Sequence, residues 1–179
     1  MMLRIRPISI KAACAWVGEH HSHHASPIGG LVALGVEESE TARLVCVAIL
    51  SRPVARLLQK DPRCAEISRV ASDGSAKNAA SMTIGAISRS ALSLGYRRLV
   101  SYTLLGEAGT SYRAAGWRPT AFTRDRKEWS TPARRRAPAA QPGRKVRWEY
   151  GPDALPVDES IVAIVRDMSG RISLPSRRV

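Results

Sequence analysis

The sequence predicts an α/β (α+β) fold, and three observations lead to this expectation. Hydrophobic residues make up 44% of the 179 residues, which is enough for one domain with a real core. Apolar residues with strand periodicity alternate with helical ones through the first 122 residues. A strand at 64–70, a loop of small polar residues, a helix at 79–94 and a strand at 98–103 also follow one another. That succession predicts a right-handed crossover between parallel strands.

The first elements are a short strand and a helix. Residues 3–8 alternate apolar and charged side chains, which favours a strand. Ser9 can accept a hydrogen bond at a helix N-terminus, and the residues after it have helical spacing. The apolar positions on one face of this helix are Ile10, Ala13, Cys14 and Val17.

Two β-rich apolar runs come next, at 31–36 and 44–50. The polar stretch EESETAR separates them, so they predict a hairpin with a loop longer than a tight turn. Pro53 ends the second strand because proline cannot donate to a sheet. Another strand is expected at 64–70.

The small-residue loop SDGSAKNAAS leads into the longest expected helix, at 79–94. Gly95 suits its C-terminal cap. After it we expect a strand at 98–103, a short helix at 110–115 and a last strand at 117–122. The buried stripe of the long helix consists of Ile84, Ile87, Ala91 and Leu94.

The positive charge is concentrated beyond residue 122. The formal net charge is +13 and the isoelectric point is about 10.8, which indicates a polyanionic partner. Nine of the basic residues lie in 124–147, together with prolines and few aliphatic side chains. We therefore expect a main domain over 1–122, a basic flexible segment over 123–147 and a C-terminal extension over 148–179. In the extension, Asp158 can cap a helix reaching about Met168 that Gly170 ends.

The order of elements resembles the GNAT fold of acetyl-CoA-dependent N-acetyltransferases, which implies a mixed central sheet flanked by helices. The strand EISRV running into SDGSAKNAASM resembles the segment that holds coenzyme A in that family. The resemblance implies a strand that binds the pantetheine arm and a loop whose N–H groups surround the pyrophosphate at a helix N-terminus. The usual Gln/Arg-x-x-Gly-x-Gly/Ala pattern is absent, and an ordinary strand-to-helix loop is the alternative. The implied acetyl-CoA-binding residues are Ile67, Ser68, Val70, Gly74, Ser75, Lys77 and Asn78.

A second segment, SYRAAGW at 111–117, is similar to the Tyr-x-x-x-Gly-Phe sequence of many GNAT enzymes. The resemblance implies that Tyr112 protonates the departing thiolate, because a thiol leaves more easily when a proton arrives. The alternative is a tyrosine that packs its ring and hydrogen-bonds its hydroxyl.

A base is needed as well, because an ammonium group must lose a proton before its nitrogen can attack a thioester. Glu66 stands where the family places such a carboxylate; its alternative is a salt bridge with Arg69 or Arg52. All four histidines lie within 20–24, and His20 and His24 would share a helix face. They are candidates for proton transfer or substrate positioning; metal binding and a surface role remain alternatives, and we assign no metal ligand.

A closer resemblance is to phage-encoded GNAT-like proteins found beside DNA-modification genes and distantly similar to the Mom adenine-modification protein. It covers about residues 5–150 and is carried by RPISIKAACAWVGEHHSHH, EISRVASDG, LGYRRLVSYTL and YRAAGWRP, with Ser51–Arg56 between the first two. It implies an acceptor amine on a nucleobase, such as 5-aminomethyluracil in phage DNA, acetylated to protect that DNA from host restriction.

Arginines and tryptophans indicate where DNA would bind. The candidate phosphate ligands are Arg52, Arg56, Arg134, Arg135 and Arg136. Trp129 and Trp148 flank the arginine run and could stack on bases, whereas a tail that only improves solubility is the alternative.

The leading interpretation is therefore an acetyl-CoA-dependent N-acetyltransferase acting on a DNA base amine. A non-catalytic DNA-binding module on a degenerate GNAT fold and a metal-dependent, Mom-like adenine modifier are the alternatives. Three unpaired cysteines, no apolar run of spanning length and no signal peptide predict a cytoplasmic protein without a membrane partner.

Overall fold

The computed structural model describes residues 2–20, 29–123 and 144–171. Within them lies one mixed seven-stranded sheet in the order β1-β2-β3-β4-β5-β7-β6. β4 (Cys64–Ser72) and β5 (Arg98–Leu104) are parallel, and the other neighbouring strands are antiparallel. The predicted crossover is present, because α2 (Ala79–Ser93) connects the two parallel strands.

The expected elements of the first 122 residues are all present. β1 (Leu3–Pro7), α1 (Ile10–His20), β2 (Val32–Glu38) and β3 (Leu44–Ser51) precede β4, and a short 3-10 helix, η1 (Leu58–Lys60), lies between β3 and β4. α3 (Thr110–Ala114) and β6 (Arg118–Phe122) follow β5. The expected caps are confirmed as well: Ser9 Oγ accepts from the Ala12 N–H at 3.2 Å, and Gly95 has the positive φ of 93° that suits a helix end.

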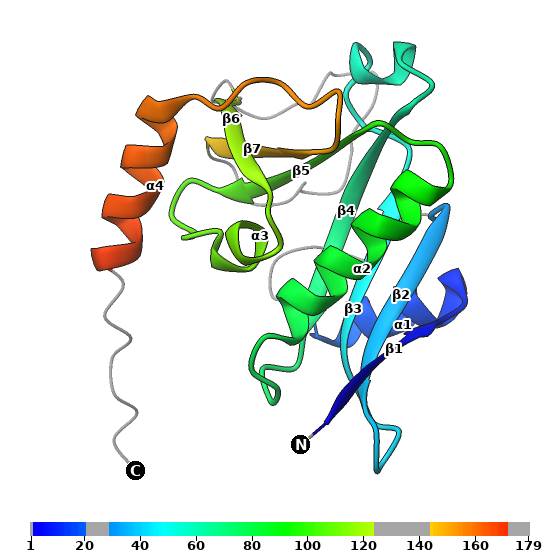
Figure 1. Cartoon of the computed structure of the whole chain (residues 1–179). Coiled ribbons are helices and arrows are strands. Elements are labelled where there is room, and N and C mark those ends of the chain that lie inside the picture. The colour runs from blue at the N-terminus through cyan, green and yellow to red at the C-terminus, as the bar shows by residue number, and fades with distance from the viewer. Residues whose placement is uncertain (1, 21–28, 124–143, 172–179) are drawn as a thin grey trace, which may run out of the picture.

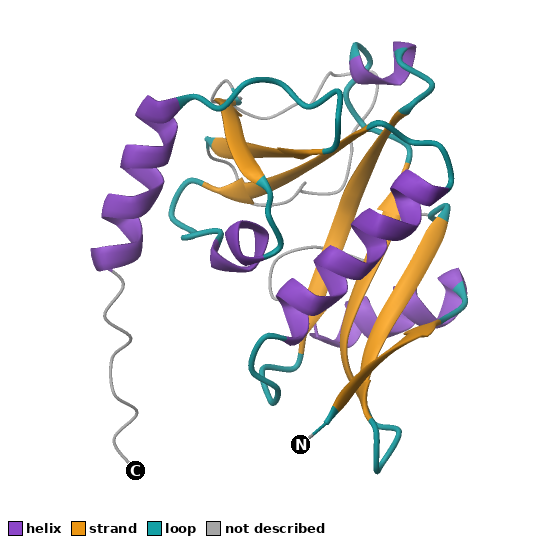
Figure 2. Cartoon of the chain, viewed as in Figure 1, coloured by secondary structure: helices purple, strands orange, loops and turns teal. Residues whose placement is uncertain are grey.

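Helices cover both faces of the sheet (Figures 1 and 2). α2 packs Ile84, Ile87 and Ala91 of its expected buried stripe against one face, in the same cluster as Ile67 of β4. Leu94, the fourth expected member, is 62% exposed at the helix end, so that expectation is wrong. On the other face, α1 packs Ala13 and Val17 against β2 and β3. Because side chains alternate along a strand, Glu66 and Ile67 of β4 lie on opposite faces of the sheet.

The domain extends further along the chain than expected. β7 (Lys145–Tyr150) pairs with both β5 and β6, so it is an inner strand of the sheet. The sheet therefore continues across the expected boundaries at 122 and 147, because β7 lies beyond the first and spans the second. Trp148, expected to stack on nucleic acid, is fully buried, and its Nε1 donates to Thr103 Oγ1 at 3.0 Å.

The C-terminal helix, α4 (Glu159–Arg171), also belongs to the domain, because Ile161 and Val165 lie in the main core. Asp158 caps it, accepting from the Ser160 N–H at 3.1 Å. The helix is described to Arg171, one residue past the expected end at Gly170. No helix in the described part of the chain is both long and apolar enough to cross a membrane.

Candidate active site

The central feature of the site is the place where β4 and β5 part. They pair through Cys64–Arg98, Ala65–Leu99 and Glu66–Val100 only. Beyond that point β4 continues along β3 and β5 along β7, and Figure 1 shows the two strands spreading apart. In this opening, the β4–β5 wedge, backbone groups of β4 beyond Ile67 have no backbone partner on β5. Such groups can hydrogen-bond an extended ligand.

β4 carries an extra residue at the start of the wedge. Leu50 pairs with Ile67 but Ile49 pairs with Arg69, so Ser68 is bulged out of register. Its hydroxyl lies 2.8 Å from Ser51 Oγ on the neighbouring strand. A bulge bends a strand and redirects its backbone groups, which favours the divergence from β5 seen here.

Tyr112, the expected proton donor, lies beside the narrow end of the wedge on the α2 side of the sheet. Its hydroxyl is 2.6 Å from Ser101 Oγ on β5, and Ser101 Oγ is 2.8 Å from the Ile67 carbonyl oxygen on β4. Ser101 has one proton, and the carbonyl can only accept, so Ser101 donates to Ile67 and Tyr112 donates to Ser101. The chain Tyr112–Ser101–Ile67 therefore links α3 to both strands of the wedge.

The tyrosine is held rigidly. Its ring is stacked near Trp148 at 5.8 Å between centroids and meets Trp117 edge-on at 5.4 Å. Burial raises the pKa of Tyr112 well above its ordinary value, and the hydrogen bond with Ser101 offsets part of this rise. The group therefore keeps its proton at neutral pH until a base is generated beside it. Ser101 is a site residue that the sequence did not reveal, because only the fold brings it to Tyr112.

Glu66 lies on the opposite face of the sheet, next to Val100. It is 7% exposed, and its Oε2 accepts from the Val54 N–H at 2.9 Å. Burial raises the pKa of Glu66, while the Val54 N–H and the charges of Arg69 and Lys145 offset part of the rise. A carboxylate with a raised pKa is a better base near neutral pH. The alternative for Glu66 was a salt bridge with Arg69 or Arg52: the charge of Arg69 acts on Glu66, whereas a pair with Arg52 is not among the ion pairs of the described residues.

Tyr102 belongs to the same face as Glu66, because it alternates with Ser101 along β5. It packs against the cluster of Leu58, Cys64 and Val100. Burial, with a contribution from the negative charge of Glu66, raises its pKa to about 12. The wedge thus has Tyr112 on one face of the sheet and Glu66 with Tyr102 on the other.

A cleft of about 340 Å³ opens at the N-terminal ends of α2 and α3. Ser72 at the end of β4, Asn78 and Ser81 at the start of α2, and Ser111 beside Tyr112 line it. Asn78 takes the N-cap position of α2 with a left-handed backbone and no side-chain cap, and the first turn contains no acidic residue. The Ala79 N–H bonds to the Ala76 carbonyl oxygen at 3.4 Å, and no side chain caps the N–H groups that follow it beside the cleft, which suits an anion.

The loop before α2 also explains the aspartate in it. Asp73 Oδ2 is 2.7 Å from an Arg43 nitrogen, and Asp73 Oδ1 accepts from the Ser75 N–H at 2.9 Å. Partial burial alone raises the pKa of Asp73, but the bonds from Ser75 and Arg43 outweigh it and lower the pKa overall. The carboxylate is thus paired away from the helix end. Gly74 has a φ of 77°, which glycine adopts readily.

The other expected residues have mixed positions. Ser68 and Val70 lie on β4 along the wedge, whereas Lys77 is exposed in the loop before α2. The His20 ring stacks on Trp16 at 3.9 Å and its Nδ1 is 3.0 Å from the Trp16 carbonyl oxygen, so the structure ties it to α1. No hydrogen bond in the described residues joins it to Glu66 or Tyr112.

The remaining expected residues divide into exposed and undescribed ones. Arg52 and Arg56 are exposed in the loop between β3 and β4. His24 and the arginines at 134–136 lie outside the described residues. Within the described ranges, no three His, Cys, Asp or Glu side chains are grouped as metal ligands.

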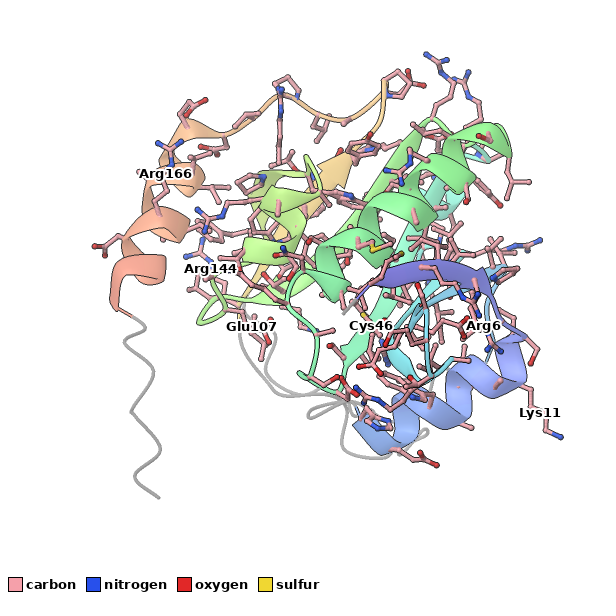
Figure 3. All side chains as sticks on the ribbon, turned by 60° about the horizontal axis from the view of Figure 1, so that its bottom comes forward. Arg6, Lys11, Cys46, Glu107, Arg144 and Arg166 are labelled. Carbon is pink, nitrogen blue, oxygen red and sulfur yellow. The ribbon has the colours of Figure 1, made fainter. Side chains whose placement is uncertain are left out.

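Two cysteines are unsuited to covalent catalysis. Cys46 and Cys64 are free thiols in the interior, and Figure 3 shows Cys46 inside the body of the protein. Burial raises the pKa of each to about 11. Because the thiolate is the nucleophilic form, neither is activated at neutral pH.

Comparison with known proteins shows which fold this is. No family model and no curated protein sequence matches the chain. Among solved structures, an acetyltransferase of Bacillus subtilis in complex with CoA is 14% identical with a TM-score of 0.54, covering 84% of this chain and 99% of its own. The ribosomal-protein-S18-alanine N-acetyltransferase of Escherichia coli is 11% identical with a TM-score of 0.57, covering 84% and 94%.

A GNAT superfamily phosphinothricin acetyltransferase of Sinorhizobium meliloti, in complex with AcCoA, is 10% identical with a TM-score of 0.59, covering 84% of this chain and 89% of its own. At these identities the likeness concerns the fold. The seven-stranded mixed sheet, its parallel pair β4 and β5 and the helices on its two faces agree with it. The chain therefore has the fold of the GNAT acetyltransferases.

Proposed function

We propose that this protein is an acetyl-CoA-dependent N-acetyltransferase acting on an amino group of a modified nucleobase in DNA. The observation that carries the proposal is the β4–β5 wedge, with Tyr112 and Ser101 at its narrow end and Glu66 on the opposite face of the sheet. A donor and an acceptor entering from opposite faces would meet in this opening.

The described residues fit acetyl-CoA, which would supply an activated acetyl group as a thioester. Asn78 and Ser81 at the uncapped start of α2 would hold its phosphates, and the backbone edge of β4 in the wedge would hold its extended arm. The pairing of Asp73 with Arg43 supports this arrangement, because it removes a negative charge from the phosphate side.

The residues on the two faces divide the proton transfers between them. Glu66 accepts the proton that the acceptor ammonium must lose, and its raised pKa suits that role. Backbone N–H groups at the bulge of β4 stabilise negative charge on a carbonyl oxygen. Tyr112 holds the proton for the departing sulfur. Ser101 then turns its own proton from the Ile67 carbonyl to the tyrosine oxygen, which stabilises the phenolate.

Charge supports a nucleic acid as the acceptor. The net charge of +13 and the arginine-rich stretch at 134–136 suit a polyanion, and Arg52 and Arg56 lie in the loop that contacts Glu66. The base amine of 5-aminomethyluracil in phage DNA is the acceptor we favour, and its acetylation would protect that DNA from host restriction.

Incubation with acetyl-CoA and DNA containing 5-aminomethyluracil tests this proposal. The DNA is digested, and the masses of the separated nucleosides are measured by mass spectrometry. Thymine-containing DNA of the same sequence is the control. The proposal predicts one added acetyl group on the aminated nucleoside only, and its loss in Glu66→Gln. If the protein binds acetyl-CoA but no nucleoside is acetylated, the result contradicts DNA as the acceptor. It does not contradict the proposed acyltransferase activity itself.

A further inference from the structure

The loop between β3 and β4, residues 52–63, carries an unusual surface. Val54 is 76% exposed and Leu57 is 80% exposed, and these are the two most exposed large hydrophobic residues of the described chain. Exposed apolar side chains close together are typical of surfaces that meet a ligand or a partner. We call residues 52–63 the docking loop.

The docking loop is rigidly constructed. Leu58 is buried beneath it, in the cluster with Cys64 and Val100. The Gln59 side chain donates to the Pro53 carbonyl oxygen at 2.8 Å, and backbone bonds join Leu58 to Ala55, Asp61 to Leu58 and Cys64 to Asp61. The loop therefore holds its two apolar side chains outward in a fixed conformation.

The loop is attached directly to the candidate base. The N–H of Val54 donates to Glu66 Oε2 at 2.9 Å. The residue whose side chain is exposed therefore also orients the carboxylate through its backbone. Whatever lies against Val54 and Leu57 is therefore held on the face of the sheet from which Glu66 would receive a proton.

Positive charge surrounds the apolar pair. Arg52, Arg56 and Lys60 are exposed, and none of them is in an ion pair of the described residues. The one acidic side chain of the loop, Asp61, accepts from the Arg63 N–H at 2.9 Å. Cationic side chains beside apolar ones suit a nucleic acid strand. Its phosphates bind the cations, and its unstacked bases contact the apolar groups.

We propose that the docking loop binds a DNA strand next to the active site, with Arg52 and Arg56 on phosphates and Val54 and Leu57 against bases. The inference rests on the proposed DNA acceptor and adds the surface that presents it. In this inference, Val54 and Leu57 separate the target base from its neighbours. A base must be unstacked in this way before its amine can reach a site inside the protein.

Fluorescence anisotropy with the full chain and a labelled single-stranded oligothymidylate tests the inference across several salt concentrations. Arg52→Gln with Arg56→Gln should weaken binding and reduce the slope of log K against log salt by about 1.4, because each phosphate contact contributes about 0.7 on single strands. Val54→Ser with Leu57→Ser should weaken binding about fivefold or more and leave the slope unchanged, because it removes apolar contacts only.

Matched controls change the same residue types elsewhere. Leu94 is 62% exposed at the end of α2, so Leu94→Ser tests the loss of an exposed leucine. Lys11 and Arg89 are exposed, and Figure 3 shows Lys11 pointing outward from α1. Lys11→Gln with Arg89→Gln tests the loss of two charges. Both controls should bind like the wild type.

Wild-type binding by both docking-loop variants would overturn the inference, as would equal competition by polyglutamate and oligothymidylate at matched charge. The proposed enzyme activity is read out separately, by melting each variant with acetyl-CoA, which the loop substitutions should not affect. No response of the wild type to acetyl-CoA, with DNA binding still lost in the loop variants, would refute the acetyltransferase and leave the docking loop supported.

Discussion

The hydrogen bond between Ser101 and Tyr112 predicts a loss of stability in Ser101→Ala that can be measured without any ligand. Ser101→Ala leaves the Tyr112 hydroxyl without its acceptor and the Ile67 carbonyl without the Ser101 donor, at a place that is 1% exposed at Ser101. Each buried polar group left unpaired costs about 1–3 kcal/mol, so the variant, which leaves two, should lose about 2–6 kcal/mol of unfolding free energy. In a domain of this size that corresponds to a fall in Tm of at least about 4 °C.

A double-mutant cycle isolates the bond itself. Urea unfolding is measured for Ser101→Ala, Tyr112→Phe and the double variant. Tyr112→Phe removes the donor, so the second substitution should then cost less, with a coupling free energy of about 1 kcal/mol or more. Ser93→Ala serves as control, because the Ser93 hydroxyl bonds to the Arg89 carbonyl at an exposed position. Additive effects within about 0.5 kcal/mol would refute the hydrogen-bonded chain.

Three further predictions concern charged residues. Because burial raises the pKa of Glu66, its stabilising contribution is full at acidic pH and is lost as pH rises through that raised pKa. In urea unfolding, the free energy of unfolding of Glu66→Gln should therefore rise relative to that of the wild type as the pH is raised from 4 to 8. Arg43→Gln should weaken acetyl-CoA binding severalfold in calorimetric titration, and adding Asp73→Asn should restore it, since Asp73 then carries no charge. Arg98→Met should cost about 2–3 kcal/mol in urea unfolding, because the buried Glu149 loses its bidentate partner and keeps only Arg147 as a charged one.

Periodicity and caps were enough to predict most of the fold. Ser9, Gly95 and Asp158 mark helix ends that the structure confirms, because each signal acts within a few residues. Gly170 lies one residue before the last described residue of α4. A glycine weakens a helix without being obliged to end it.

The composition around β7 hides a strand that its residue pattern indicates. Val146, Trp148 and Tyr150 alternate with Arg147 and Glu149, which is the signature of a strand. The arginines and prolines just before it led to its assignment partly to a basic segment. Trp148 was misjudged for the same reason.

Part of the candidate site could not be predicted because it depends on contacts between distant segments. Ser101 meets Tyr112 through the packing of α3 on β5, and Arg43 meets Asp73 across 30 positions of sequence. Val54 reaches Glu66 because the docking loop folds back over β4. Tyr112 and Glu66 were proposed from a family resemblance, which carries three-dimensional information that local periodicity lacks.

Thermal melting with and without acetyl-CoA tests the central claim most directly. A ligand at about 100 times its dissociation constant adds about 2.7 kcal/mol, which should raise Tm by at least about 5 °C for a domain of this size. That shift is the result predicted here. An unchanged Tm at millimolar acetyl-CoA would contradict an acetyl-CoA site at the α2 N-terminus and the β4–β5 wedge.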